Sequence, residues 1–317
     1  MKQSRFPARR VAVRCLPAAA LGLMASLTSG GAEPPRQAWR SAGEIIDAAP
    51  AAHWRQPDPA NLLFMQVNGG IVIIELAPRF APEHVANIRT LARERFWDGT
   101  SVYRVQDNFV AQFGDADADD PAKAKSLGGA KRKLPAEFHR DVKDLPFDPL
   151  PDRDGWAPES GFVDSFPAAR DPRSGKAWLA HCYGAVGAGR SNEPDSSTGA
   201  ELYVVIGQAP RQLDDNITVV GRVLMGMEYL SALKRGSEEM GMYARPEERM
   251  PIRALVLGSE IPAGVRPRIE VLRSDSSSFR DATEARRNRV DEFYRRPAGH
   301  IDLCNVPVPV RLQPAGP

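Results

Sequence analysis

A pair of apolar segments separated by a turn signal places the strongest constraint on the fold. Residues 62–67 and 71–76 are rich in Leu, Val and Ile, and Asn68, Gly69 and Gly70 lie between them. An Asn-Gly turn between two such runs favours a β-hairpin, because these residues readily adopt the positive φ angles of a tight turn. The sequence therefore predicts two antiparallel strands that begin a β-rich domain.

Short apolar runs continue along the chain, and its 28 prolines and 26 glycines place turns between many of them. Only two stretches in this region have helical spacing, one that opens at Pro82 and ends at Asp98-Gly99, and one at residues 226–233. Many short strands with few helices indicate a mainly β, closed or nearly closed antiparallel architecture. Further strands are expected at residues 101–105, 108–113, 178–186, 201–206, 217–223 and 252–257.

Two regions depart from this pattern. Residues 116–176 contain acidic residues and prolines without a sustained period, so we expect a long loop insertion of a kind that is often functional or mobile. Residues 259–317 form a C-terminal extension, in which residues 276–296 carry a thin apolar stripe and predict an exposed helix. The five arginines between residues 286 and 296 fit a solvated helix face better than a site for nucleic acid or anionic lipid.

The beginning of the chain has the composition of an export signal. A basic head precedes the apolar residues 16–27, and the small residues 29–32 follow as a cleavage site. The apolar segment is too short for a permanent membrane span. We therefore expect residues 1–32 to be removed, residues 33–60 to form a leader that packs on the domain, and the mature protein to be periplasmic. Export by the Sec route or by a twin-arginine signal at Arg9-Arg10 both stay open.

Charge and metal-ligand content argue against two classes of function. The 42 basic and 40 acidic residues leave a net charge of +2 and are well mixed, whereas nucleic-acid binders usually carry a one-sided basic surface. The five histidines and three cysteines show no metal-ligand spacing. We expect neither nucleic acid nor a metal or other cofactor as a partner.

Two cysteines, Cys182 and Cys304, remain once the export signal is removed. In an oxidising compartment such a pair is a candidate disulfide. The alternative is that Cys182, inside the apolar run 178–186, is an ordinary buried thiol and that Cys304 is free. The residues themselves leave both interpretations open.

Three blocks of sequence resemble the cyclophilin-type peptidyl-prolyl cis–trans isomerases. Residues 70–88 resemble the family's opening strand and first helix, residues 96–115 its catalytic segment, and residues 213–227 its later strand and helix. The resemblance covers residues 62–257 and implies an isomerase domain at 61–258, folded as a closed eight-stranded antiparallel barrel capped by two helices. We expect a monomer that acts on proline-containing polypeptides without a cofactor and without stable membrane insertion.

The reaction of this family needs no nucleophile, because no covalent bond breaks. A prolyl amide rotates past a barrier of ~18–20 kcal/mol that arises from amide resonance. A cation that hydrogen-bonds the prolyl nitrogen favours the twisted state over the planar one. Arginine suits this task because it stays charged and offers a rigid set of donors. The motif of the family assigns the role to Arg104.

The substrate-binding residues are assigned by the same matching. Phe109 and Val110 are implied to line a proline pocket, and Gln112 to bond the substrate backbone. An unbroken strand over residues 108–113 would place Phe109 and Gln112 on opposite faces, so a bend or bulge is needed to bring them together. The resemblance adds the substrate-binding positions Glu201, Tyr203, Leu213 and Ile217.

Several positions differ from the family pattern. Glu201 stands where a glutamine is usual, and we expect its carboxylate to pair with Arg104. Because aromatic residues are replaced at Gln212 and Val220, the pocket is expected to be shallower and less aromatic. These changes keep open an alternative function, a binding module or chaperone of the same fold with weak or no isomerase activity. The differing positions are Tyr103, Glu201, Tyr203, Gln212, Ile217 and Val220.

Overall fold

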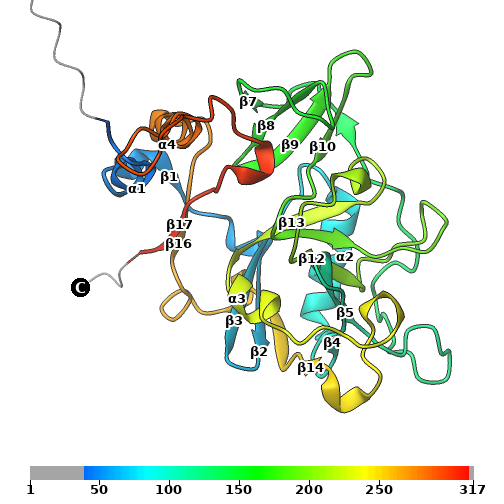
Figure 1. The fold of residues 1–317 in the computed structure, drawn as a ribbon. Coiled ribbons are helices and arrows are strands. Elements are labelled where there is room, and N and C mark those ends of the chain that lie inside the picture. Colours follow the sequence, from blue (N-terminus) through cyan, green and yellow to red (C-terminus); the bar gives the residue numbers. More distant parts are fainter. Residues whose placement is uncertain (1–38, 314–317) are drawn as a thin grey trace, which may run out of the picture. The chain divides into compact units, whose positions relative to one another are not determined.

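The computed structural model describes residues 39–313 (Figure 1). The expected export signal at residues 1–32 lies outside the described residues. Among those that are described, no helix combines the length and the apolar character needed to cross a membrane.

The main sheet of the described chain has nine antiparallel strands in the order β14-β4-β5-β12-β11-β13-β3-β2-β15. Its first hairpin is the one that the sequence predicts: β2 and β3 pair from Leu62↔Glu75 to Val67↔Gly70, and Gly69 in the turn has a φ of 92°. The nine strands are β2 Leu62–Val67, β3 Gly70–Leu76, β4 Ser101–Val105, β5 Val110–Gly114, β11 Ala185–Ala188, β12 Leu202–Val205, β13 Val219–Met225, β14 Met250–Pro251 and β15 Ala254–Leu257.

The two ends of this sheet are consecutive in the chain. Only Ile252 and Arg253 separate β14 from β15, and their N–H groups donate to the carbonyls of Thr100 and Gln66. The sheet is therefore curled, so that one short segment runs along both of its edges. The ladders show nine strands in a curled sheet, and not the closed eight-stranded barrel that the resemblance implies.

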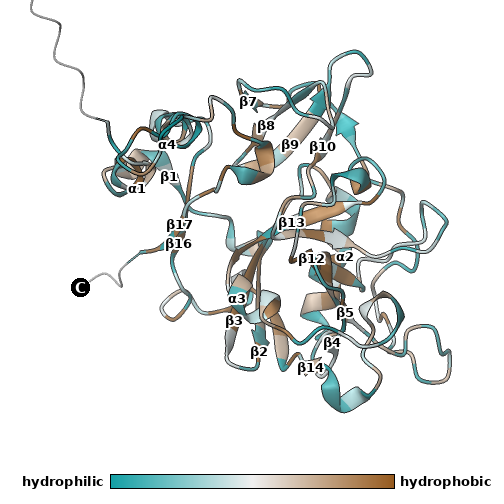
Figure 2. Cartoon of the chain, in the orientation of Figure 1, coloured by the Kyte–Doolittle hydropathy of each residue, from teal (hydrophilic) through white to brown (hydrophobic). Residues whose placement is uncertain are grey.

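The inner face of the curled sheet holds the main hydrophobic core. Alternate residues of β3 point into it, and helices α2 (Pro82–Arg93) and α3 (Met227–Ser231) add their apolar faces. Helix α2 begins at Pro82 as predicted, and it ends at Arg93, ahead of the expected stop at Asp98-Gly99. In Figure 2 the strongly hydrophobic ribbon is concentrated in the strands, whereas the long loops are mostly hydrophilic.

The second half of the insertion forms most of a second sheet. The prediction of a loop throughout residues 116–176 is therefore wrong for that half. The order is β6-β10-β9-β8-β7. Strands β8 and β9 are joined by Asp164 and Ser165, which both have positive φ and so form a tight two-residue turn without glycine. The five strands are β6 Arg140–Asp141, β7 Asp148–Pro149, β8 Glu159–Val163, β9 Phe166–Asp171 and β10 Lys176–Leu179.

The second sheet supports the outer face of the main sheet. The apolar run predicted as one strand at residues 178–186 is divided between β10 of the second sheet and β11 of the main sheet, because the chain turns between Ala180 and Gly184. Phe166 and Leu179 of the second sheet pack in one buried cluster with Tyr203 and Val205 of β12. The insertion thus completes the packing beneath the outer face of β12.

The leader and the C-terminal extension form a third layer together. Strand β16 (Ile269–Leu272) pairs with β1 (Trp54–Arg55) from the leader on one side and with β17 (Val310–Leu312) on the other. Helix α1 (Ala42–Asp47) lies beside α4 (Ser277–Arg287), as Figure 1 shows. A disulfide joins Cys182, between β10 and β11, to Cys304 of the extension, with 4.9 Å between their Cα atoms.

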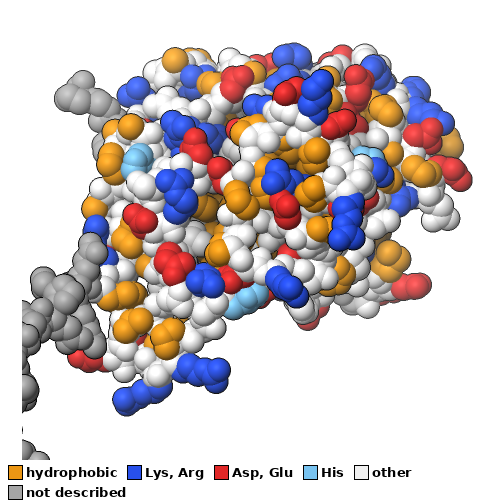
Figure 3. All heavy atoms as spheres, turned by 90° about the horizontal axis from the view of Figure 1, so that it is seen from above, with side chains coloured by type: hydrophobic (Ala, Val, Ile, Leu, Met, Phe, Trp, Pro, Cys, Tyr) orange, Lys and Arg blue, Asp and Glu red, His pale blue; other side chains and the backbone are white. Residues whose placement is uncertain are grey.

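Helix α4 differs from the exposed helix predicted at residues 276–296. It ends at Arg287, and it is anchored by Phe279, which is buried and meets Phe162 of β8 edge to face at 4.9 Å between ring centres. Beyond it Phe293 is 81% exposed, so its side chain supplies no buried apolar contact that would stabilise a longer helix. On the face drawn in Figure 3, basic and acidic side chains are interspersed rather than separated.

Candidate functional site

A cavity of about 540 Å³ opens beside β4, β5 and β12. All eight residues that the sequence assigns to the site line it, although they come from four separate stretches of chain. Its other lining residues include Tyr103, Asp115, Arg190 and Met242, which sequence reasoning did not select as site residues. The eight are Arg104, Phe109, Val110, Gln112, Glu201, Tyr203, Leu213 and Ile217.

A β-bulge in β4 brings two consecutive side chains to this cavity. Val102 is paired with Phe113 and Arg104 with Gln112, so Tyr103 is an extra residue in the ladder. In a regular strand Tyr103 and Arg104 would point to opposite faces. The bulge removes that alternation, and both side chains hydrogen-bond to Gln112.

The bend that the alternation argument requires lies just before β5. Asn108 has a φ of 51°, and the Gln106 N–H donates to the carbonyl of Val110, which closes a turn around Phe109. Phe109 therefore precedes the strand instead of belonging to its inner face. It shares the cavity with Val110 and Gln112, whereas Ala111 and Phe113 point into the main core.

Three hydrogen bonds hold the Arg104 guanidinium at the cavity. Nε donates to the carbonyl of Met240 at 2.8 Å, Nη1 to Oε1 of Gln112 at 2.9 Å, and Nη2 to Oε1 of Gln106 at 2.6 Å. Partial burial lowers the pKa of Arg104, yet an arginine remains protonated in proteins. A guanidinium has five N–H donors, so one hydrogen on each Nη is left over from these three bonds.

Glu201 terminates a chain of hydrogen bonds that starts at Arg104. Gln112 Nε2 donates to Tyr103 Oη at 2.6 Å, and Tyr103 O–H donates to Glu201 at 2.8 Å. The other carboxylate oxygen accepts the N–H of Asp115 at 2.8 Å. The expected ion pair of Glu201 with Arg104 is therefore wrong, because Tyr103 and Gln112 stand between them.

Burial has the largest effect on the pKa values of Glu201 and Tyr103. It raises the pKa of Glu201 to about 7, against the opposing effect of the hydrogen bonds from Tyr103 and Asp115. It also raises the pKa of Tyr103, and the neighbouring Glu201 adds to that shift. The phenol thus stays protonated and acts as the donor that orients the chain.

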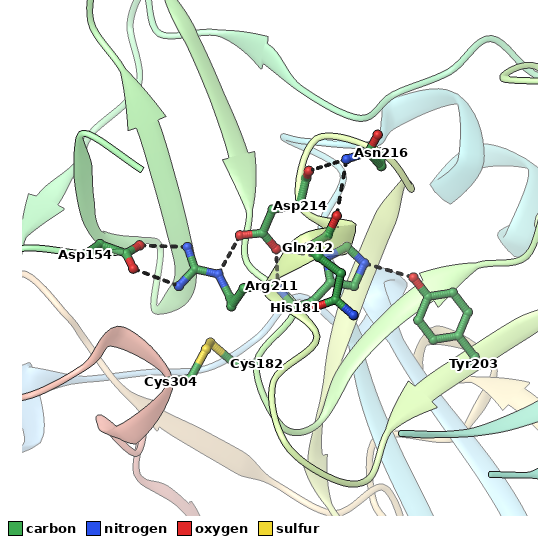
Figure 4. Close-up of polar contacts among 9 residues, drawn as sticks. All are labelled: Asp154, His181, Cys182, Tyr203, Arg211, Gln212, Asp214, Asn216 and Cys304. Atoms are coloured by element: carbon green, nitrogen blue, oxygen red, sulfur yellow. Dashed lines mark hydrogen bonds and ion pairs between the residues drawn. A yellow bond between two sulfur atoms is a disulfide. The ribbon is translucent and has the colours of Figure 1, made fainter. Parts of the chain in front are cut away.

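The floor of the cavity rests on a buried polar network (Figure 4). Tyr203 Oη lies 2.9 Å from His181 Nε2, and His181 Nδ1 lies 3.0 Å from Asp214. Ionised Asp214 can only accept a hydrogen bond, so the hydrogen between the two groups lies on Nδ1 of His181. In the neutral ring with that tautomer, Nε2 accepts from the Tyr203 hydroxyl. Arg211 completes the network by donating to Asp214 and, on its other side, to Asp154.

Asp214 is the carboxylate that joins His181 to Arg211. Burial opposes its ionisation, but hydrogen bonds from His181 and the Arg211 charge outweigh it and lower the pKa of Asp214. Burial raises the pKa of Tyr203. Arg211 and Asp214 are only three residues apart, but His181 reaches them only through the tertiary fold, so no spacing in the sequence marks the network.

Two of the positions that differ from the family lie away from the cavity. Gln212 is exposed, and Val220 is fully buried in the main core, so the idea that Val220 lines the pocket is wrong. The cavity keeps the aromatic rings of Phe109 and Tyr203. Gly187 on β11 allows the Tyr203 ring to lie where it does, since a Cβ there would stand 2.1 Å from Tyr203 Cζ.

Comparisons with known proteins agree with this geometry. The model of the family described as cyclophilin type peptidyl-prolyl cis-trans isomerase/CLD matches residues 62–256, about three fifths of the chain. A probable peptidyl-prolyl cis-trans isomerase of Brucella suis is 29% identical over 198 residues, which cover 60% of this chain and 81% of the relative. The human peptidyl-prolyl cis-trans isomerase-like 1 is 28% identical over 96 residues, or 30% of this chain and 54% of its own length.

A solved structure extends the likeness beyond the matched domain. The cyclophilin AquaCyp293 from Hirschia baltica superimposes with a TM-score of 0.65 and 27% identity, covering 82% of this chain and 93% of the other. That coverage exceeds the span of the family model, so part of the layer outside the isomerase domain is shared as well. From its sequence, its curled β-sheet and its relatives, this chain belongs to the cyclophilin-type peptidyl-prolyl cis–trans isomerases.

Proposed function

We propose that the enzyme lowers the barrier to X–Pro rotation by hydrogen-bonding the prolyl nitrogen with Arg104. The observation that carries this proposal is the state of its guanidinium, which is fixed by three hydrogen bonds and has a further hydrogen on each Nη at the cavity. The nitrogen gains a localised lone pair only when the amide twists. A donor fixed in advance therefore stabilises the twisted state more than either planar isomer.

The apolar residues of the cavity suit a proline ring. Phe109, Val110, Leu213 and Ile217 line it together with the ring of Tyr203. The guanidinium carbon of Arg104 lies 5.9 Å from the centre of the Phe109 ring, so the cation and the apolar wall are adjacent. A proline seated against Phe109 would present its nitrogen toward Arg104.

Gln112 supplies a contact for the substrate backbone. Its Oε1 accepts from Arg104 and one Nε2 hydrogen goes to Tyr103, which fixes the orientation of the amide. A carboxamide nitrogen carries two hydrogens, so the second one remains for a carbonyl of the substrate. The same side chain thus positions Arg104 and holds the peptide.

We further place the enzyme in the periplasm, acting on proline-containing chains of the cell envelope. Two observations support this location: the export-signal composition of residues 1–32 and the disulfide between Cys182 and Cys304, a bond typical of oxidising compartments. Mass spectrometry of a periplasmic fraction should find a mature chain that begins near residue 33. A full-length chain confined to the cytoplasm would contradict the location but not the catalytic mechanism.

The mechanism is tested by Arg104→Ala in a protease-coupled assay on a short X–Pro peptide. The variant should lose a factor of about 100 to 1,000 in kcat/KM, the scale seen when one preorganised donor is removed. Arg253→Ala, at an exposed arginine between β14 and β15, is the matched control and should keep the wild-type rate. Circular dichroism and a melting curve establish that both variants fold.

A folded Arg104→Ala with the wild-type rate would overturn the role of Arg104. No acceleration by the wild-type protein would instead favour a binding module.

A further inference from the structure

One wall of the isomerase cavity is formed by Met242, which follows the 3-10 helical turn η4 (Glu239–Gly241). Met242 pairs with Arg104 in an isolated antiparallel bridge, along the edge of β4 that faces away from β5. Met242 is 37% exposed, although its side chain is apolar. An unbranched apolar side chain thus stands partly in solvent beside Arg104.

The backbone that carries Met242 is fixed. Gly241 has a φ of 82°, and a Cβ on it would stand 2.5 Å from the Cα of Gln106, so this turn requires glycine. The Glu238 N–H donates to the carbonyl of Met242 at 3.0 Å, and the Tyr243 N–H donates to a carbonyl of β4 at 3.3 Å. A substrate that contacts Met242 therefore has to order only a side chain, which keeps the entropic cost of the contact small.

The cavity is polar at the end opposite to Met242. Arg104 and Glu201 occupy the two ends of the hydrogen-bonded chain in this cavity. The Glu201 carboxylate accepts the N–H of Asp115 and its backbone carbonyl accepts the N–H of Gly189, so two loops meet at the Glu201 end. Apart from one glycine and two alanines, the residues of these loops that line the cavity are Asp115, Asp119, Arg190, Ser191, Ser196 and Thr198, all of them polar.

We propose that Met242 selects substrates with an apolar residue next to the proline. This inference rests on the proposed function, which places the prolyl nitrogen at Arg104. Consecutive Cα atoms are about 3.8 Å apart, so the residue on one flank of the proline comes within reach of the Met242 side chain. A thioether chain is flexible and polarisable, and it packs against apolar side chains of different shapes. The other flank leads toward the Glu201 end, where an apolar residue meets polar groups, so the preference is one-sided.

A set of short X–Pro peptides tests this one-sided preference. Each has alanine on both flanks of the proline, except that one flank carries leucine or serine. NMR exchange spectroscopy measures the catalysed rotation directly, without a protease whose own preferences would enter. At one flank leucine should raise kcat/KM about fivefold over serine, because part of an apolar side chain is buried, and at the other flank by less than about twofold.

Three variants assign the preference to its side chain. Met242→Gln keeps the length but replaces the thioether with an amide, and it should lower the ratio of leucine to serine to below about twofold. Met242→Leu stays apolar and should keep the ratio above about threefold. Val265→Thr is the matched control, because Val265 is 74% exposed and is not among the cavity-lining residues, and it should keep the wild-type ratio. Circular dichroism shows whether each variant is folded.

The outcomes distinguish this inference from the proposed function. A wild-type protein that accelerates none of the peptides would contradict the proposed function itself. Acceleration with an equal gain from leucine at both flanks, or with no gain at either, would overturn the role of Met242 and leave the mechanism at Arg104 intact. A folded Met242→Gln that keeps the full ratio would overturn it as well.

Discussion

Replacing Glu201 with glutamine should reverse the relative stability of variant and wild type between acid and mildly alkaline pH. Burial raises the pKa of Glu201 to about 7 in the folded chain, compared with an ordinary value of 4.5. Below that ordinary value, the folded and unfolded chains both hold the proton. Between the two values only the folded chain keeps it, so the free energy of unfolding falls as the pH rises. Above about pH 7 the loss is complete.

The size of the effect follows from the interval between the two pKa values. At about 1.4 kcal/mol for each pH unit, the buried carboxylate costs the wild type about 3 kcal/mol by pH 7.5. Glutamine does not ionise, but its NH2 group replaces one of the two oxygens that accept from Tyr103 O–H and Asp115 N–H, and losing that hydrogen bond costs about 1 kcal/mol. Glu201→Gln should be about 1 kcal/mol less stable than the wild type near pH 4.5 and about 2 kcal/mol more stable near pH 7.5.

Urea unfolding of both proteins across this pH range measures the difference directly. The comparison with the wild type is essential, because groups such as Asp214, whose pKa is lowered, change the total stability in the opposite direction. Equal m-values would show that both unfolding transitions expose the same surface. A stability difference that stays constant with pH would refute the assignment of a raised pKa to Glu201.

Two further substitutions test the floor of the site and the extension. Tyr203→Phe keeps the ring in the cavity but leaves His181 Nε2 buried without a donor, so urea unfolding should show a loss of about 1–3 kcal/mol; wild-type stability would argue against the network. Cys304→Ser opens a loop that spans 122 residues and should lower the stability by about 4–5 kcal/mol in the chain-entropy model, with a lower melting temperature and an unchanged isomerase rate. A melting temperature that neither this change nor reduction of the wild type alters would contradict the bond's contribution.

Local sequence signals were sufficient for much of the fold. Asn68 and Gly69 mark the turn of the first hairpin, because these residues accept a positive φ, and Pro82 marks the start of α2, because proline fixes φ at a helical value. The second sheet was missed because its main turn uses Asp164 and Ser165. Both adopt positive φ without the glycine that would have signalled it, since the strands on either side impose that geometry.

The site was predictable only in part for a similar reason. The family motif places Arg104, Phe109 and Gln112, and all three line one cavity. Tyr103 joins Arg104 at the cavity only because of a bulge in β4, which depends on the pairing with β5 and not on β4 alone. The support of Tyr203 by His181 joins a strand residue of β12 to a residue of the loop between β10 and β11, and the two are 22 positions apart in the sequence.

The three-stranded layer of β1, β16 and β17 has a consequence for the order in which the molecule is assembled during synthesis. Strand β1 leaves the ribosome with residues 54–55, yet the strand that it pairs with, β16, is made only at residues 269–272, after every strand of the main sheet. The main sheet can therefore form first, before β1 has a strand to pair with. Contacts so distant along the chain form slowly. Cys304 is synthesised later still. The disulfide can therefore form only after all strands of the two larger sheets have been synthesised.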